Sequence, residues 1–139
     1  MNIWLVSREY AGIAEAGGVK NVACSLSENL VRLGHDVTLF IPFYGCTSLS
    51  KIDDYDDSKN LTASVQVMSK EECVEFSHGT KKGVRIVFVH HPSFLEKKAV
   101  YTYTQEEEQC NPAHKKGHGH EDSISMNIIF QKSVVAYSK

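Results

Sequence analysis

The chain has 139 residues, of which 42% are hydrophobic and 23% are charged, with a formal net charge of −2. This balance is typical of one soluble globular domain and excludes a disordered chain or a coiled coil. No Lys/Arg-rich face stands out and no apolar run reaches the roughly 20 residues that span a bilayer, so we expect neither a nucleic-acid nor a membrane partner. The start, Met1-Asn2-Ile3-Trp4, lacks the basic and apolar segments of a signal peptide, which predicts a cytoplasmic location.

The first 42 residues predict one βαβ unit. The continuous apolar run 3–6 is typical of a parallel strand that is buried on both faces. Apolar residues then recur every three or four positions and predict an amphipathic helix over 19–33, with Gly34 at its C-terminal cap. The predicted buried stripe of this helix is Val19, Val22, Ala23, Leu26, Leu30 and Leu33. The run 37–41 predicts a second buried strand, parallel to the first and ended by Pro42.

The middle of the chain predicts a β-hairpin. The polar and acidic stretch 48–60 is predicted to be an exposed loop, and the alternation in 61–68 predicts a strand with one solvent-exposed face. Strands over 73–76 and 84–89 flank the turn-like segment SHGTKKG, and together they predict the hairpin. A short helix is expected at 93–96.

The last third predicts a loop and a final helix. The stretch 102–121 is polar throughout and long enough to suggest a functional or disordered loop. Asp122 and Ser123 are expected to cap the final helix. Its predicted apolar stripe is Ile124, Ile128, Ile129, Phe130 and Val134 or Val135.

These elements together predict the α/β class. The expected architecture is a Rossmann-like parallel sheet with helices on both faces and a β-hairpin in the second half. Residues 1–139 are expected to form a single domain. A doubly wound sheet normally continues with further strands, so we expect this domain to be incomplete.

The cysteines and histidines give little support for a metal site. The four cysteines contain no CxxC pair, so we expect free thiols: Cys24, Cys46, Cys73 and Cys110. The segment CNPAHKKGHGH holds Cys110, His114, His118 and His120 in one irregularly spaced loop, which favours a solvated loop over a closed tetrahedral site. We therefore expect no metal and no other cofactor.

Two glycines, Gly17 and Gly18, stand at the expected start of the first helix, although glycine is more typical of a helix end. The first N–H groups of a helix are unpaired, and its dipole places roughly half a positive charge there, so such a corner attracts anions. In an open α/β sheet, this corner lies at the carboxyl ends of the strands, where ligands bind. The pair matches neither GxGxxG nor a Walker A loop, and in an alternative interpretation it only permits tight packing of strand against helix.

The segment WLVSREYAGIAEAGGVKNVACSLSENLVRLGHDVTLFIPFY resembles the amino-terminal start of bacterial glycogen and starch synthases. The matching residues are Ser7, Glu9, Gly17, Gly18, Val22, Leu33, Gly34, His35, Asp36, Val37 and Pro42. The later segments VRIVFVHHPSFLEKKAVY and EDSISMNIIFQKSVVAY are similar to family segments in the same order. The resemblance implies the N-terminal domain of a GT-B glycosyltransferase, which has two Rossmann-like domains and an active site between them.

The resemblance also implies an activity and its partners. Such enzymes transfer glucose from a nucleoside diphosphate glucose donor to an α-1,4-glucan acceptor with retention of configuration, and Gly17 and Gly18 would face the donor. The implied partner within the protein is a C-terminal domain, without which the fragment is expected to be inactive. Glu15 stands where the family has a lysine that contacts the donor phosphate, whereas Lys20 either replaces that cation or is solvated. The alternative function is a degenerate, non-catalytic domain that binds a glucan or a partner.

Several other side chains have two interpretations each, and none is assigned a catalytic role. His90 and His91 follow a buried strand and are either an acid–base pair or hydrogen-bonded strand-end residues. Tyr101 and Tyr103 either stack on sugar rings or pack in the ordinary way. Glu9 either orients the glycine loop through backbone N–H groups or is a surface charge.

Overall fold

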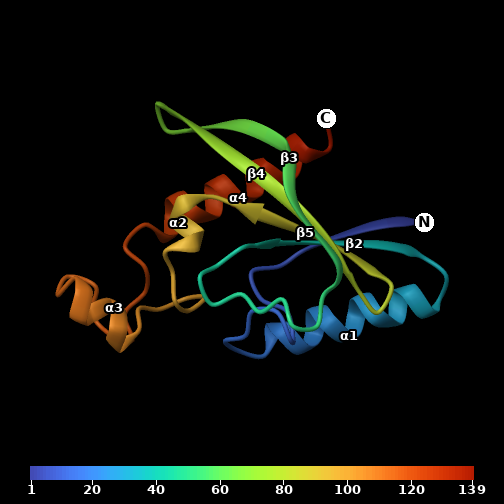
Figure 1. Cartoon of the computed structure of the whole chain (residues 1–139), viewed down its shortest axis with the longest axis horizontal. Coiled ribbons are helices and arrows are strands. Elements are labelled where there is room, and N and C mark those ends of the chain that lie inside the picture. The colour runs from blue at the N-terminus through green and yellow to red at the C-terminus, as the bar shows by residue number, and fades with distance from the viewer.

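The computed structural model describes residues 1–139 as a five-stranded sheet with four helices (Figure 1). The strands are β1 (Asn2–Val6), β2 (Asp36–Pro42), β3 (Asp53–Val67), β4 (Lys70–Lys81) and β5 (Val84–His90). The helices are α1 (Val19–Arg32), α2 (Pro92–Leu95), α3 (Gln105–Cys110) and α4 (Ser123–Tyr137). The strand order is β1-β2-β5-β4-β3; β1, β2 and β5 are parallel, and β4 and β3 continue the sheet in antiparallel fashion. The α/β class and the hairpin are thus confirmed, in a mixed sheet.

The helices α1 and α4 cover opposite faces of the sheet. Lys81 of β4 reaches Cys24 and Glu28 of α1, whereas His78 of β4 shares a hydrogen bond of 3.0 Å with the hydroxyl of Tyr137 in α4. Successive strand residues alternate between faces, so the odd spacing of these two β4 residues places the two helices on opposite sides. Among the strands, β2 and β5 contribute most to the core cluster of 23 buried residues. β1 is an edge strand in which Trp4 and Val6 are exposed, so the prediction that it is buried on both faces is wrong.

The first helix forms where the pattern predicts it and ends as expected. Its C-terminal cap is Leu33, and Gly34 follows with a φ of +91°, a conformation that glycine adopts most easily. The amide of Gly34 donates to the carbonyl of Val31 and the amide of His35 to that of Leu30, which is the Schellman arrangement. This closure turns the chain directly into β2.

The predicted buried stripe of α1 is wrong for its largest members. Val19, Val22, Leu26 and Leu33 are between 47% and 74% exposed. Of the predicted stripe, Ala23 and Leu30 do pack against the core, and the helix adds Cys24, Ser27 and Val31, which the prediction left out. Small side chains are needed there because the fully buried ring of Tyr10 packs beneath the helix, with its hydroxyl 2.5 Å from that of Ser27.

The stripe of α4 also needs correction. Ile124 and Val135 are 69% and 58% exposed, whereas the buried positions are Met126, Ile129, Phe130, Ser133 and Val134. The carboxylate of Asp122 stands at the N-cap position but pairs with the buried ammonium of Lys97 at 3.0 Å and not with the helix amides. None of the four helices has both the length and the apolar character needed to cross a membrane.

The acidic stretch that was predicted to be a loop contains the start of β3. Its pairing with β4 shifts register between Asp53, Asp56 and Leu61, and the aspartates remain exposed along this edge strand. Charged side chains on an irregular edge strand hide the alternation from which strands are recognised. The hairpin from β4 to β5 is confirmed, but its predicted connection over 77–83 is too long: residues 77–81 pair with β5, and the turn is formed by Lys82 and Gly83.

The polar stretch 102–121 is not a loop throughout, because α3 lies within it. Thr104 begins this helix with a capping box: its hydroxyl accepts from the amide of Glu107, whose carboxylate in turn accepts from the amide of Thr104. The T-x-x-E pattern was the sequence signal for this helix. The short helix expected at 93–96 is confirmed as α2.

Candidate active-site edge

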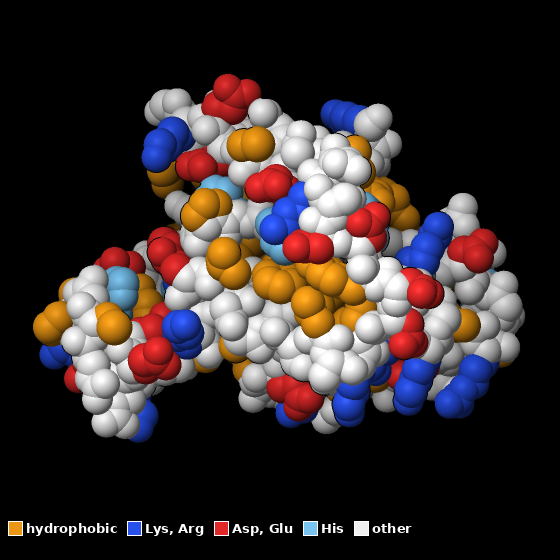
Figure 2. All heavy atoms as spheres, in the orientation of Figure 1, with side chains coloured by type: hydrophobic (Ala, Val, Ile, Leu, Met, Phe, Trp, Pro, Cys, Tyr) orange, Lys and Arg blue, Asp and Glu red, His pale blue; other side chains and the backbone are white.

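The carboxyl ends of β1, β2 and β5 lie along one edge of the sheet, and the segment 7–18 links β1 to α1 there. This segment folds on itself, because Tyr10 and Ala14 form an isolated bridge in which the amide of each donates to the carbonyl of the other. Figure 2 shows apolar side chains gathered in the middle of the visible face, with charged side chains along α1 below them. The glycine corner lies where the segment enters the helix.

Glu9 holds the inner side of the glycine corner. Its side chain is fully buried, and its Oε1 accepts from the amides of Gly17 at 3.1 Å and Lys20 at 2.9 Å. Burial alone raises the pKa of Glu9, but hydrogen bonds from the Tyr101 hydroxyl and from two backbone amides outweigh it and hold that pKa below its usual range. The expectation that Glu9 orients the loop is confirmed, and its carboxylate stays ionised at neutral pH.

The backbone amides on the outer side of the corner have no hydrogen-bond acceptor. Gly18 is the N-cap of α1 with φ −80° and ψ −20°, and it has no side-chain cap. No group in the structure accepts from the amides of Gly18 and Val19, and all three residues from Gly17 to Val19 are exposed. Two N–H groups at the positive end of a 14-residue helix therefore face solvent.

Nothing in the fold requires the two glycines. Neither has a positive φ, a Cβ on Gly17 would meet only the Glu9 carboxylate at 3.8 Å, and a Cβ on Gly18 would meet nothing within 4 Å. Tight packing of strand against helix, the alternative explanation for the pair, is therefore absent at Gly18. The space that its missing side chain leaves opens outward.

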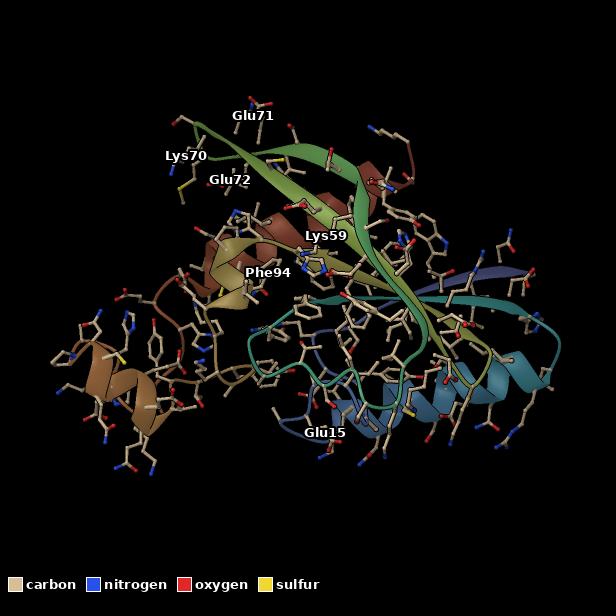
Figure 3. The ribbon with its side chains drawn as sticks, in the orientation of Figure 1. Glu15, Lys59, Lys70, Glu71, Glu72 and Phe94 are labelled. Atoms are coloured by element: carbon tan, nitrogen blue, oxygen red, sulfur yellow. The ribbon has the colours of Figure 1, made fainter.

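Glu15 neutralises the one lysine that lies close to the corner in sequence. Its carboxylate accepts from the amide of Gly12 at 2.9 Å and pairs with the ammonium of Lys20 at 3.2 Å. Both contacts hold the pKa of Glu15 below its usual range, with the amide contributing more. Figure 3 shows Glu15 beside the first turn of α1. Lys20 is thus an ion-pair partner and does not replace a phosphate-binding lysine as a free cation.

A polar hollow of about 420 Å³ opens beside the same segment. It is lined from the chain that follows each of the three parallel strands: Gly12 and Glu15 after β1, Ser48, Ser50 and Lys51 after β2, and Lys98 after β5 and α2. The amide of Ser48 donates to the carbonyl of Ile13 at 2.8 Å and ties the first two segments together. The convergence of three strand ends is the usual place of a ligand site in an open α/β sheet.

Comparison with known proteins identifies the family. The sequence model of the starch synthase catalytic domain matches residues 2–135. The chain belongs to this family. Granule-bound starch synthase 1 of Manihot esculenta is 34% identical over 99 residues, which cover 70% of this chain and 15% of the relative. Granule-bound starch synthase 2 of Pisum sativum is 37% identical over 94 residues, which cover 68% of this chain and 12% of the relative.

A solved structure shows the same fold. The catalytic domain of starch synthase IV from Arabidopsis thaliana, bound to ADP and acarbose, matches with a TM-score of 0.64 and 24% identity, over 76% of this chain and 22% of that one. The chain therefore spans about 15% of the length of the curated relatives and about a fifth of the solved structure.

The two histidines at the end of β5 of this starch synthase family member are both hydrogen-bonded. His90 contacts the buried Ser77 hydroxyl at 2.6 Å through Nε2, and burial together with nearby Lys59 (Figure 3) lowers its pKa to about 4. Nε2 of His91 contacts Glu72 of the hairpin at 2.9 Å, and its Nδ1 accepts from the amide that it caps in α2. The interpretation as strand-end residues with satisfied partners fits both.

The remaining sequence candidates do not form a second site. The hydroxyl of Tyr101 is directed to Glu9, and burial together with this hydrogen bond raises the pKa of Tyr101 to about 12. The Arg8 guanidinium lies over the Tyr101 ring, 4.5 Å from its centroid. Tyr103 is buried, with the His114 ring stacked on it at 4.2 Å and His120 at its edge. No three His, Cys, Asp or Glu side chains converge as metal ligands, and all four cysteines are free.

Lys51, Lys98 and the two serines of the hollow were not predicted from sequence. They lie in polar segments without a recognisable motif. Lys51 and Lys98 are 47 residues apart in the sequence and line one hollow because β2 and β5 are neighbours in the sheet. The only available signal was positional. Each follows a buried parallel strand.

Proposed function

We propose that residues 1–139 form the donor-side, N-terminal domain of a starch- or glycogen-synthase-type glucosyltransferase, incomplete without further polypeptide. In this proposal, the domain binds a nucleoside diphosphate glucose, and a C-terminal domain closes the cleft over the donor and an α-1,4-glucan acceptor. The support is family membership together with the open glycine corner at the carboxyl edge of the sheet. We also propose that the protein is cytoplasmic and that its α-1,4-glucan product is glycogen or starch.

The corner suits the chemistry of such a transfer. When the glucosyl bond to the diphosphate breaks, negative charge grows on the leaving phosphate oxygens. Fixed N–H donors and a helix N-terminus stabilise that charge without having to reorganise. The free amides of Gly18 and Val19 are such donors, and Glu9 fixes their position from the inner side.

The observation that carries the proposal is the open space at Gly18. If glycine is needed at position 18 because a ligand occupies the open space, and not because the fold requires it, Gly18→Ala should leave folding intact and impair binding. We expect the affinity for ADP, measured by calorimetry, to fall by about tenfold, because a methyl group would displace the phosphate from the amides. The melting temperature should change by no more than about 2 °C.

Gly119→Ala is the matched control. Gly119 also has a negative φ and empty space where its Cβ would lie, but it belongs to the distant segment after α3. It should leave both ADP affinity and the melting temperature unchanged. Equal ADP affinity in Gly18→Ala and wild type would overturn the assignment of the corner to the donor.

A second function is favoured by one observation, the Glu15–Lys20 ion pair, at the position where the family resemblance implies a lysine that contacts the donor phosphate. It supports a degenerate domain that binds a glucan or a partner without transfer. The two functions differ in calorimetry with maltoheptaose and ADP. Binding of maltoheptaose without any binding of ADP favours the degenerate domain, and ADP binding that depends on Gly18 favours the donor-side domain.

A further inference from the structure

We infer that the hollow beside the glycine corner is an anion subsite for the donor diphosphate, in which Lys51 and Lys98 supply the positive charge that Glu15 does not. This inference rests on the proposed function and adds to it the residues that recognise the phosphate. It places the charge on the segments after β2 and β5 and not on the segment after β1, where the family lysine stands.

Lys51 and Lys98 are the two cations that line the hollow. Lys20 pairs with Glu15 and Lys81 pairs with Glu28, whereas neither Lys51 nor Lys98 takes part in any ion pair. Both line the same hollow although they come from different segments. An ammonium group without a carboxylate partner is hydrated by water at little cost in free energy. It therefore gains more free energy from an incoming phosphate than a lysine that is already paired.

The position of Lys51 is built into the segment after β1. Gly12 has a φ of +82°, and a Cβ placed on it would lie 3.1 Å from Cδ of Lys51. The aliphatic part of the Lys51 side chain thus runs close over Gly12. Glycine is favoured at position 12 both by this close contact and by its positive φ. The lysine is thereby directed along the wall of the hollow.

Hydroxyl groups and a neutralised carboxylate complete the lining. The hydroxyls of Ser48 and Ser50 are 3.0 Å apart and offer donors to an anion. Glu15 also borders the hollow, but its charge is balanced by the Gly12 amide and the Lys20 ammonium. The excess charge of the lining is therefore positive.

The test is calorimetric titration of the 139-residue chain with inorganic pyrophosphate and with ADP at low salt. The variant is the double substitution Lys51→Ala with Lys98→Ala. The matched control, Lys70→Ala with Lys115→Ala, removes the same net charge at exposed positions outside the hollow. We expect the hollow variant to bind both ligands about tenfold more weakly, and the control to stay within about twofold of wild type.

The outcomes separate this inference from the proposed function. If the hollow variant binds pyrophosphate and ADP as wild type does, while Gly18→Ala loses ADP, the lysine subsite is refuted and the donor-side domain stands. If the hollow variant loses binding and Gly18→Ala does not, the lysine subsite stands and the glycine corner is refuted. Failure of wild type to bind either ligand at millimolar concentration refutes both. Far-UV circular dichroism establishes that each variant is folded.

Discussion

The inner and outer sides of the glycine corner differ in whether their polar groups are paired. On the inner side, the buried Glu9 carboxylate accepts from the amides of Gly17 and Lys20. On the outer side, the amides of Gly18 and Val19 and the ammonium groups of the hollow have no partner. The paired and unpaired amides lie next to one another in the chain, from Gly17 to Lys20.

The difference separates what holds the site from what binds at it. A buried polar group without a partner is costly, so the inner side must be satisfied within the fold. Exposed N–H and ammonium groups are satisfied by water and can exchange that water for a ligand. Substitutions on the inner side should therefore change stability first, and substitutions on the outer side should change binding alone.

The largest expected effect is on the inner side, at Glu9. Glu9→Ala leaves two amides and the Tyr101 hydroxyl without their acceptor, which should lower the free energy of unfolding by about 2 to 3 kcal/mol. Glu9→Gln keeps one acceptor oxygen and should cost about half as much. Urea denaturation measures both. Glu9→Ala with wild-type stability would show that the carboxylate does not hold the corner.

The next effect is a pH dependence from His90, which belongs to the paired side of the same edge. Its folded pKa of about 4 lies below the ordinary value of 6.5, so the unfolded chain takes up the proton first. Stability from this group is complete above pH 6.5 and is lost as pH falls from 6.5 to 4, by about 2 kcal/mol after allowance for partial exposure.

Replacing this histidine isolates its contribution. His90→Gln should flatten the slope of stability against pH between 6.5 and 4 in urea titrations. The depressed pKa of Glu9 acts in the same direction but at lower pH, because its contribution is lost only as pH falls below its ordinary range of about 4.5. An unchanged slope in His90→Gln would contradict the burial of a neutral imidazole.

The smallest expected effect is a gain on the outer side. Glu15→Lys removes a carboxylate from the hollow, frees Lys20 and introduces the lysine that the family resemblance implies. We expect ADP affinity in calorimetry to rise about fivefold, with the melting temperature unchanged. Glu71→Lys, at the exposed turn between β3 and β4 (Figure 3), is the matched control and should not bind more tightly. An equal increase in ADP affinity in both variants would show that the effect depends on the net charge of the chain and not on the position of Glu15.

The same contrast explains which features could be predicted from the sequence. The βαβ unit and the Gly34 cap were predictable because apolar runs, helical periodicity and a C-terminal glycine are local signals. The sheet-facing side of α1 was predictable only at Ala23 and Leu30, since Tyr10 occupies the space beneath the helix and a small polar residue, Ser27, meets its hydroxyl.

The site was predictable only in part for a similar reason. Gly17 and Gly18 could be singled out because glycine at a helix start is locally unusual. Lys51 and Lys98 carry no local signal, since their proximity depends on the order of β1, β2 and β5 in the sheet. The irregular start of β3 was missed because exposed aspartates conceal its alternation.

The most direct test of the account is a titration of the isotopically labelled chain with ADP, followed by ¹⁵N–¹H correlation NMR. We expect saturable shifts at the amides of Gly18 and Val19, which are free, and small shifts at Gly17 and Lys20, whose amides donate to Glu9. If ADP saturates the chain without moving the Gly18 and Val19 signals, the open corner is not the site of the phosphate.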